Sequence, residues 1–516
     1  MGRGLKSLRK KKQIKAKKRE ETMGKCVGAL DLGTTGVRTV LFDSAAREVA
    51  SAYRELPLST PRPGWVEQDP ELMVRLALEV IGEAIARAGI RPGDIAALGI
   101  TVQRETSIVW DRETGKALHP AIVWQDRRTA PRCDELRRDH GELIRDRTGL
   151  PLDPYFSATK LEWLLANVPG LAEKAGRGEV AFGTVDSWLL FRLCGVHATD
   201  PTNASRTMLF DIRRLAWDPD LLALFSVPAG ILPEVRPSLS EFGATKGELL
   251  GAEIPVTGVL GDQQAALFGQ GALSRGGAKV TWGTGAFLLM NTGDRPVPSR
   301  HGLLTTVAYA AGDWVAYALE GSVFVAGAAV QWLRDLGLIS SAAESEELAR
   351  SLVGNDGVYF VPALAGLGAP HWDPYARGTI VGLTRGTSRA HLARAALESI
   401  AYQTTDLVRA MEADAGIRLA ELRVDGGAAR NDFLCEFQAD ILGIPVVRPE
   451  VLETTALGAA LAAGVSAGIW EFSDIPELLR VERRFEPRMP LEERERLHAG
   501  WRAAVERARG WAKELG

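Results

Sequence analysis

The sequence lacks the motifs of the common nucleotide-binding folds. It contains no G-x-x-x-x-G-K-[ST] and no G-x-G-x-x-G segment, and the signature set of the protein kinases is absent as well. Those motifs hold phosphates on glycine-rich loops ahead of a helix. The absences exclude a P-loop or Rossmann interpretation, so any nucleotide must be held in another way.

Cysteine is scarce and histidine is scattered. The four cysteines, Cys26, Cys133, Cys194 and Cys435, form no C-x-x-C pair, and the seven histidines do not cluster. This excludes a disulfide framework and a structural zinc site. The longest uncharged run, Thr454–Trp470, has 17 residues rich in Ala and Gly. It is shorter than the roughly 20 residues of a membrane span and predicts a buried, tightly packed helix.

Positive charge is concentrated at the N-terminus. The formal net charge is −3, but residues 1–25 carry 11 Lys and Arg against Glu20 and Glu21 (+9), which leaves −12 on the remainder. We expect residues 1–24 to be a disordered basic extension, of which a start at Met23 would omit residues 1–22. An arm that contacts RNA or a membrane is the alternative. No apolar stretch there suits a secretory signal, so we expect a cytoplasmic, soluble protein.

The chain has two halves that open alike. Strands at Cys26–Asp31 and Val37–Asp43 flank Gly33–Gly36, and strands at Ala278–Trp282 and Phe287–Asn291 flank Gly283–Gly285. This pattern predicts two α/β lobes with a cleft between them. Further strands are expected at Glu48–Leu56, Ile95–Val102, Ile254–Leu260, Glu421–Val424 and Ile444–Val447. Helices are expected at Pro70–Ala88, Ser322–Leu336 and Arg389–Ala415, and a further helix after Gly427 ends at Leu442.

A carboxylate and two amides follow one apolar strand, in Gly261-Asp262-Gln263-Gln264. A strand that ends in Gly-Asp places the carboxylate at the mouth of a sheet. There it can take a proton from an alcohol while a phosphoryl group is transferred to the oxygen. Gly-Asp is also a common turn, so the motif depends on its companions.

Two glycine- and threonine-containing turns are candidate phosphate loops. In Asp31-Leu32-Gly33-Thr34-Thr35-Gly36, backbone N–H groups and threonine hydroxyls can approach an anion, and Asp31 can hold a hydrated Mg²⁺. Gly283-Thr284-Gly285 offers a second such turn. Each turn alone is as readily a structural hairpin, but their position at the start of both halves strengthens the functional interpretation.

Other polar and aromatic residues have two interpretations. Arg104-Glu105 is either a surface ion pair or a donor–acceptor set for the hydroxyls of a polyol. Trp124 and Phe287 are core aromatics or ligand platforms, and the Tyr155 hydroxyl can bind substrate or cap a loop. Gly426-Gly427 ahead of a helix allows close approach of a nucleotide, or is a simple turn.

A family resemblance joins these pieces, and it runs from about Lys25 to the C-terminal helix. The chain resembles the FGGY family of carbohydrate kinases, and within it the glycerol kinases. The resemblance is carried by Asp31-Leu32-Gly33-Thr34-Thr35, Gln103-Arg104-Glu105-Thr106, Ile122-Val123-Trp124-Gln125, Asp153-Pro154-Tyr155-Phe156-Ser157, Thr202-Asn203-Ala204-Ser205-Arg206-Thr207-Met208, Gly261–Gln270, Gly366-Leu367-Gly368-Ala369-Pro370 and Asp425-Gly426-Gly427.

The resemblance implies an actin-like (ribonuclease H-like) ATPase fold of two α/β lobes. Residues 25–273 would be the glycerol-binding N-terminal lobe and residues 274–516 the nucleotide-binding C-terminal lobe. The implied reaction is ATP- and Mg²⁺-dependent phosphorylation of glycerol to sn-glycerol 3-phosphate, in glycerol catabolism, with Asp262 as the general base. The implied partners are glycerol and ATP or ADP. We expect a homo-oligomer that contacts no nucleic acid or membrane except through the basic tail.

The resemblance also implies roles for matching residues. The glycerol site would comprise Arg104, Glu105, Tyr155, Asp262, Gln263 and Thr34, with Trp124 and Phe287 against the carbons. The nucleotide phosphates would face Thr34, Thr35, Gly36, Arg38 and Thr284. The rest of the nucleotide would be held by Gly327, Gln331, Gly427 and Asn431, and Mg²⁺ by Asp31 through water.

The chain departs from the family pattern at four places. Leu32 replaces the usual Gln, Gly36 the usual Ser, and Trp282 the usual Tyr. Segment Gly243–Ala252 lacks the glycine-rich basic loop that some relatives use for feedback by a sugar bisphosphate, so the resemblance does not extend to that regulation. The alternatives are a family member acting on a longer polyol or a ketose, and a regulator on the same fold that binds ligand without turnover.

Overall fold

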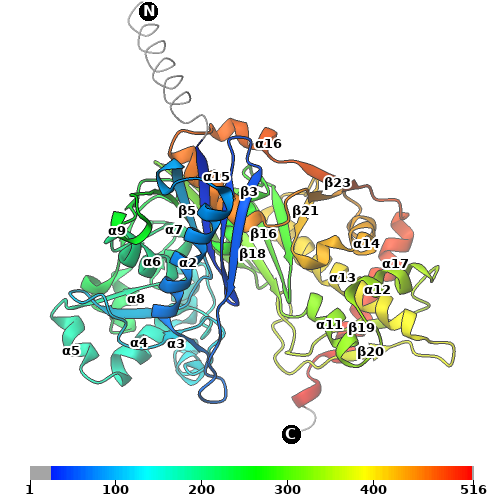
Figure 1. Cartoon of the computed structure of the whole chain (residues 1–516). Helices are drawn as coiled ribbons and strands as arrows, with labels where there is room; N and C mark the ends of the chain where they lie inside the picture. The colour runs from blue at the N-terminus through cyan, green and yellow to red at the C-terminus, as the bar shows by residue number, and fades with distance from the viewer. Residues whose placement is uncertain (1–24, 514–516) are drawn as a thin grey trace, which may run out of the picture. The chain divides into compact units, whose positions relative to one another are not determined.

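The computed structural model describes residues 25–513, and the predicted basic extension, residues 1–24, lies outside the described residues. The described chain forms two compact units (Figure 1). The first comprises residues 25–271, Thr306–Tyr317 and Thr454–Leu479. The second comprises Ala272–Thr305, Ala318–Glu453 and residues 480–513. Each unit therefore contains segments that are distant in the sequence.

A six-stranded sheet forms the centre of the first unit. Its order is β13-β14-β5-β1-β2-β3, with β13 at Gly243–Ala244, β14 at Pro255–Gly261, β5 at Ile95–Val102, β1 at Cys26–Leu32, β2 at Gly36–Phe42 and β3 at Glu48–Glu55. Strands β1, β5 and β14 are parallel, whereas β1, β2 and β3 form an antiparallel meander. Parallel strands present their carboxyl ends at one edge of the sheet, which is where ligands bind in open α/β sheets.

Helix α2, Pro70–Ala88, packs on this sheet in the way its sequence predicts. The side chain of Asp69 accepts from the N–H of Glu71 at its start, and Gly89 ends the helix with φ +67°. Its apolar side, which includes Met73 and Val80, is buried in the core of the sheet. The cap residues and the apolar stripe therefore both determine the bounds of the helix.

Helix α15, Thr454–Ser466, lies beside β5 although it is far from it in the sequence (Figure 1). The contact is close because glycines line it: an added Cβ at Gly99 would lie 2.1 Å from the Ala459 carbonyl oxygen. Another at Gly458 would lie 1.8 Å from the carbonyl oxygen of Ala265. The predicted buried helix is confirmed over these residues. Within residues 25–513, no helix is long and apolar enough to cross a membrane.

The first unit contains further helices and several short strands. Its helices are α3 (Ala130–Thr148), α4 (Ser157–Asn167), α5 (Leu171–Gly176), α6 (Val185–Cys194), α7 (Pro201–Ala204), α8 (Pro219–Leu224), α9 (Gly247–Leu250), α10 (Asp262–Gly269) and α16 (Ile475–Leu478). Its strands are β4 (Glu67–Gln68), β6 (Ile108–Asp111), β7 (Ala121–Ile122), β8 (Val180–Gly183), β9 (Ala198–Thr199), β10 (Phe210–Asp211), β11 (Ala216–Trp217) and β12 (Glu234–Val235).

The second unit contains most of a seven-stranded sheet and a cluster of helices. The strand order is β17-β18-β16-β15-β21-β22-β23, with β17 at Leu304–Ala311, β18 at Trp314–Val323, β16 at Ala286–Gly293, β15 at Ala278–Trp282, β21 at Leu422–Asp425, β22 at Val446–Pro449 and β23 at Val481–Phe485. A small second sheet pairs β19 (Tyr359–Val361) with β20 (Thr379–Val381). Strands β15 and β21 are parallel neighbours.

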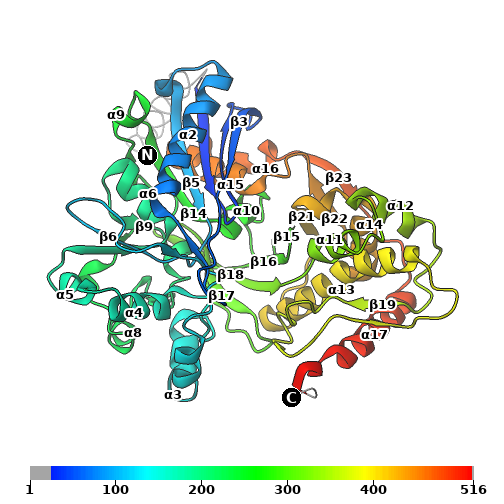
Figure 2. The ribbon, with the colours of Figure 1, turned by 60° about the horizontal axis from the view of Figure 1, so that its bottom comes forward.

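Helix α13, Arg389–Ala415, is the longest helix of the second unit and is largely buried. Figure 2 shows it in yellow beside α12 (Ala342–Arg350) and α14 (Asp432–Leu442), which both contact it. Its Tyr402 stacks on Trp501 of α17 (Leu491–Ala508), with ring centroids 5.3 Å apart.

One predicted helix begins later than expected. The sequence predicts a helix from Ser322 to Leu336, but α11 spans Gly327–Asp335, because Ser322 and Val323 are the last residues of β18. The strand continues as far as the β-branched Val323, and Ala326, with ψ −93°, separates strand from helix. The strand predicted from Ile444 likewise begins at Val446.

Candidate active site

Three parallel strands of the first unit end side by side. Leu32 at the end of β1 pairs with Val102 at the end of β5, and Val102 pairs with Gly261 at the end of β14. The residues that follow these strands are Gly33 of the first candidate phosphate loop, Gln103-Arg104-Glu105, and Asp262. The register therefore brings three of the predicted motifs to one edge of one sheet.

Asp262 opens helix α10 and is held by Arg104. The Nε atom of Arg104 lies 3.1 Å from Oδ1 of Asp262, and Nη1 of Arg104 donates to Oε1 of Gln264 at 3.1 Å. The backbone N–H of Gln263 also donates to Oδ1 of Asp262, at 2.7 Å. Arg104 is buried, whereas the side chain of Asp262 remains 29% exposed. The guanidinium holds the carboxylate in place, and the carboxylate stays accessible to a substrate.

The residue at position 261 must be small for this arrangement. A Cβ added at Gly261 would lie 2.7 Å from Cδ of Arg104. The glycine in the Gly-Asp pair therefore makes room for the arginine that holds the aspartate, and it is more than a turn residue.

Glu105 forms a buried ion pair with Arg206. Its Oε1 atom lies 2.5 Å from Nε of Arg206, and both side chains are almost completely shielded from solvent. Glu105 has φ +63°, a left-handed backbone that non-glycine residues adopt rarely. The Ser157 hydroxyl donates to the Glu105 carbonyl oxygen at 2.9 Å. Of the two interpretations of Arg104-Glu105, a surface ion pair is wrong, because both side chains are buried; Arg104 contacts Asp262 and Glu105 contacts Arg206.

The predicted aromatic residues Trp124 and Tyr155 lie together. Their ring centroids are 5.4 Å apart at an edge-to-face angle of 88°. Nε1 of Trp124 donates to Oγ1 of Thr34 at 2.9 Å, which ties the aromatic pair to the first loop. The Nζ atom of the buried Lys160 donates to the Tyr155 carbonyl oxygen at 2.6 Å, and burial lowers the pKa of Lys160 from 10.5 to about 7.

The first candidate phosphate loop turns its carbonyl groups toward the protein. The Thr34 carbonyl oxygen accepts from Nε2 of Gln68 at 2.7 Å, and that of Thr35 accepts from the N–H of Leu56 at 2.9 Å. Among the hydrogen bonds of residues 25–513, none uses the N–H of Thr34 or Thr35 as donor. Free N–H groups on a turn are the feature that binds anions.

The donor set for a magnesium ion is small. Within the described part of the chain, no three His, Cys, Asp or Glu side chains group as a metal cage. Asp31 lies in β1 next to the loop and opposite Arg38 of β2. A single carboxylate beside a phosphate site fits Mg²⁺, because this ion keeps several waters and shares its ligands with substrate phosphates.

Three predicted nucleotide residues meet around the loop after β15. The N–H of Gly327, at the start of α11, donates to the Gly283 carbonyl oxygen at 3.0 Å. An added Cβ at Gly327 would lie 2.6 Å from that oxygen. Gly426 has φ +85°, and an added Cβ would lie 2.6 Å from the carbonyl oxygen of Trp282. The turn with Thr284, the start of α11 and the turn with Gly427 are therefore neighbours, and a Cβ at Gly427 would meet nothing within 4 Å.

The other predicted residues of the second unit have local roles. The Asn431 side chain accepts from the N–H of Leu434 at 2.9 Å and caps α14. Nε2 of Gln331 donates to Oδ1 of Asp335 along α11 at 2.7 Å. Phe287 is half-buried on β16, opposite Thr281 of β15.

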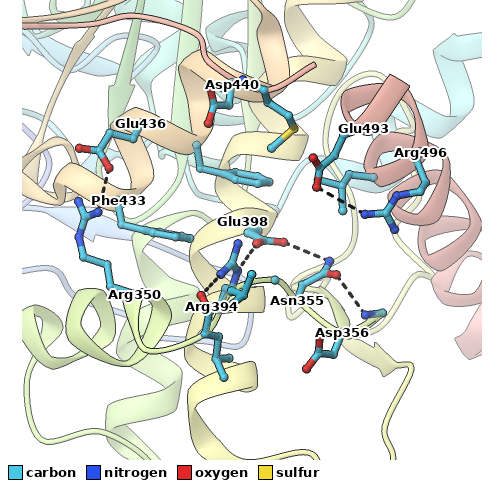
Figure 3. A pocket seen from close by; sticks show the side chains of 17 residues that line it. Arg350, Asn355, Asp356, Arg394, Glu398, Phe433, Glu436, Asp440, Glu493 and Arg496 are labelled. Carbon is cyan, nitrogen blue, oxygen red and sulfur yellow. Dashed lines mark hydrogen bonds and ion pairs between the residues drawn. The ribbon is translucent and has the colours of Figure 1, made fainter. Parts of the chain in front are cut away.

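A cavity of about 630 Å³ lies elsewhere in the second unit, between α13, α14 and α17 (Figure 3). None of the predicted site residues lines it. Its acidic groups are engaged: Glu398 accepts from Nε of Arg394 at 2.6 Å and from Nδ2 of Asn355 at 3.2 Å. Burial raises the pKa of Glu398 above its ordinary value. The cavity is therefore separate from the groups that follow β1, β5 and β14.

Four supporting residues were not predicted: Arg206, Gln264, Lys160 and Gln68. Arg206 and Gln264 stand inside motifs that were identified, but their partners, Glu105 and Arg104, are more than 100 residues away in the sequence. Gln68 follows no recognisable motif. Only the fold brings these side chains to the site.

Comparisons with known proteins identify the family of the chain. The model of the FGGY family of carbohydrate kinases, N-terminal domain, matches residues 26–269, and that of the C-terminal domain matches residues 278–467. The chain is 59% identical to a glycerol kinase of Thermus brockianus, covering 94% of this chain and 99% of the relative. It is 57% identical to a glycerol kinase of Symbiobacterium thermophilum, with coverage of 94% and 99%.

A solved structure is similar along almost the whole chain. The crystal structure of Plasmodium falciparum glycerol kinase with ADP matches with a TM-score of 0.89 at 37% identity, covering 94% of this chain and 98% of that one. The two-domain α/β architecture is that of the actin-like carbohydrate kinases. By family match, sequence identity and fold, the chain belongs to the FGGY family of carbohydrate kinases.

Proposed function

We propose that this protein transfers the γ-phosphoryl group of ATP to glycerol and forms sn-glycerol 3-phosphate. The observation that carries the proposal is the accessible Asp262 carboxylate, held by Arg104 at the sheet edge where the first phosphate loop also begins. Full-length relatives named glycerol kinase, at 57–59% identity, support glycerol as the substrate.

Asp262 is the general base for the terminal hydroxyl of glycerol. Its carboxylate takes the proton as the oxygen attacks the phosphoryl group. Arg104 holds it in place and, together with Glu105, Tyr155 and Gln263, binds the hydroxyl groups. Thr34 supports this site through its hydrogen bond with Trp124. A triol requires several fixed partners, because a site built for hydroxyl groups rejects a ligand that lacks them.

The aromatic residues restrict the size of the substrate. Trp124 and Tyr155 pack edge to face, and making room for a longer substrate would break this contact. Trp124 and Phe287 would pack against the carbon chain of glycerol. Bulky rings at these positions favour a three-carbon substrate over longer polyols and ketoses.

The phosphates are bound by backbone groups and hydroxyls, not by a P-loop. The phosphates contact Thr34, Thr35, Gly36, Arg38 and Thr284. Gly327, Gln331, Gly427 and Asn431 hold the remainder of the nucleotide. Mg²⁺, held near Asp31, would neutralise charge on the phosphates when bound. We further expect the protein to work in the cytoplasm as a homo-oligomer.

The test is the release of ADP by the purified protein with ATP and Mg²⁺. Glycerol would be compared with a panel of four- to six-carbon polyols and ketoses under the same conditions. The proposal predicts that kcat/KM is highest for glycerol by at least about tenfold, the scale on which pocket size discriminates. Preference for a longer substrate would overturn the assignment of the pocket, and ATP binding without turnover on any substrate would indicate a regulator.

A further inference from the structure

The glycine at position 36 is covered by a tyrosine from the neighbouring strand. Tyr53 lies on β3, the edge strand, opposite Arg38, so its ring reaches diagonally across β2 to Gly36. An added Cβ at Gly36 would lie 2.3 Å from both Cε2 and the hydroxyl oxygen of Tyr53. An aromatic side chain that covers a glycine near a sheet edge stabilises the strand pairing there. A larger residue at position 36 would require the Tyr53 ring to move.

Tyr53 also contacts the backbone of the candidate phosphate loop. Its hydroxyl donates to the Thr35 carbonyl oxygen at 3.3 Å, the same oxygen that accepts from the N–H of Leu56. On the other side of the loop, the Thr34 carbonyl oxygen is held by Gln68. Both carbonyl groups are therefore fixed toward the protein, and the N–H groups of Thr34 and Thr35 are left to bind a ligand.

The same ring lies next to a charged residue of the loop region. The guanidinium carbon of Arg38 is 5.5 Å from the centroid of the Tyr53 ring, within the range of a cation–π contact. Tyr53 thus contacts, through three different parts of its side chain, Gly36, Thr35 and Arg38. All three belong to the set expected to face the nucleotide phosphates.

We infer that Tyr53 is a positioning residue for nucleotide binding, coupled to the glycine at position 36. The inference rests on the proposed function for the identity of the nucleotide. Tyr53 does not itself contact the reacting atoms. It orients the loop so that the backbone N–H groups of Thr34 and Thr35 point at the phosphates, and it replaces the packing that a larger residue at position 36 would supply.

The first test removes the Tyr53 hydroxyl alone. Tyr53→Phe should weaken binding of ATP with Mg²⁺, measured by calorimetry, by about threefold, the scale of one hydrogen bond in water. The melting temperature and the KM for glycerol should not change. Tyr375→Phe is the matched control, because Tyr375 has the same exposure, 44%, and lies in the second unit. An unchanged ATP affinity for Tyr53→Phe would overturn the inference.

The second test measures the coupling between the two positions. Gly36→Ser should weaken ATP binding by at least about tenfold, because the serine side chain collides with the Tyr53 ring. In a Tyr53→Ala background the same Gly36→Ser change should cost less than about twofold. If the two changes are additive, the positions act independently and the inference is wrong.

Direct binding separates this inference from the proposed function. A wild-type protein that binds ATP but does not phosphorylate glycerol would disprove the function while the Tyr53 effect remains measurable. If the wild type phosphorylates glycerol but Tyr53→Phe binds ATP as tightly as the wild type does, the inference alone is disproved. A wild-type protein that does not bind ATP would overturn both.

Discussion

Replacing Arg206 by Met should both destabilise the protein and impair glycerol binding. The Nε atom of Arg206 lies 2.5 Å from Oε1 of Glu105, and neither side chain is accessible to water. The change would remove the guanidinium that pairs with the buried Glu105 carboxylate. Removing one member of a buried pair costs about 3–5 kcal/mol, a large part of the 5–15 kcal/mol by which proteins are typically stable. The KM for glycerol should rise at least about tenfold, because Arg206 orients Glu105.

The assay is urea unfolding combined with steady-state kinetics. Arg213→Met is the matched control: Nη1 of Arg213 lies 2.9 Å from Oδ1 of Asp146, but the pair is exposed and its loss should cost less than about 1 kcal/mol. Adding Glu105→Gln to Arg206→Met should restore part of the lost stability, because it removes the buried negative charge that Arg206 had paired. Arg206→Met with control-like stability and unchanged glycerol KM would refute the reasoning.

Two further experiments test the electrostatics and the packing of the first unit. Because Lys160 has a pKa of about 7 in the folded protein against 10.5 normally, the unfolded chain binds more protons between pH 7 and 10. Lys160 should therefore make the unfolding free energy rise with pH there, by up to about 1.4 kcal/mol per pH unit, and Lys160→Met should lose this contribution. The free energy is measured by urea unfolding at pH 7.5 and 9.5. The same change with pH in the wild type and in Lys160→Met would contradict the prediction. Gly458→Ala should lower the unfolding free energy by about 1–3 kcal/mol or more, since its Cβ would lie 1.8 Å from the Ala265 carbonyl oxygen. Gly82→Ala is the control, because an added Cβ there meets nothing within 4 Å, and it should stabilise the protein slightly. Similar unfolding free energies for the two variants would show that the contact between α15 and α10 is loose.

Most of the regular structure could be predicted from local sequence. The helices predicted at Pro70–Ala88 and Arg389–Ala415 and the strands at Ile95–Val102 and Ala278–Trp282 have those bounds in the structure. Their periodic apolar residues and terminal Asp or Gly residues leave little ambiguity. The start of α11 was wrong because an apolar, small-residue run such as Glu320–Gly327 suits a buried strand and a helix equally well.

The family and its two-domain fold are confirmed, whereas the roles of individual residues stay predictions. The strand-end motifs with Asp262, Arg104 and Thr34 could be found because glycine and polar residues interrupt apolar runs there. The pairing of Glu105 with Arg206 could not, because it joins positions 101 residues apart. The predicted lobe boundary after residue 273 also stays a prediction. The compact units of the structure divide nearby, between Gly271 and Ala272.

The most direct test of the account is the turnover of glycerol by Asp262→Asn. The amide keeps the shape of the side chain but cannot accept the proton of the terminal hydroxyl, and general-base catalysis contributes about 10²–10⁴-fold. The account predicts that kcat falls by at least about 100-fold while the melting temperature and ATP binding remain those of the wild type. An Asp262→Asn enzyme that phosphorylates glycerol at a rate close to wild type would contradict it.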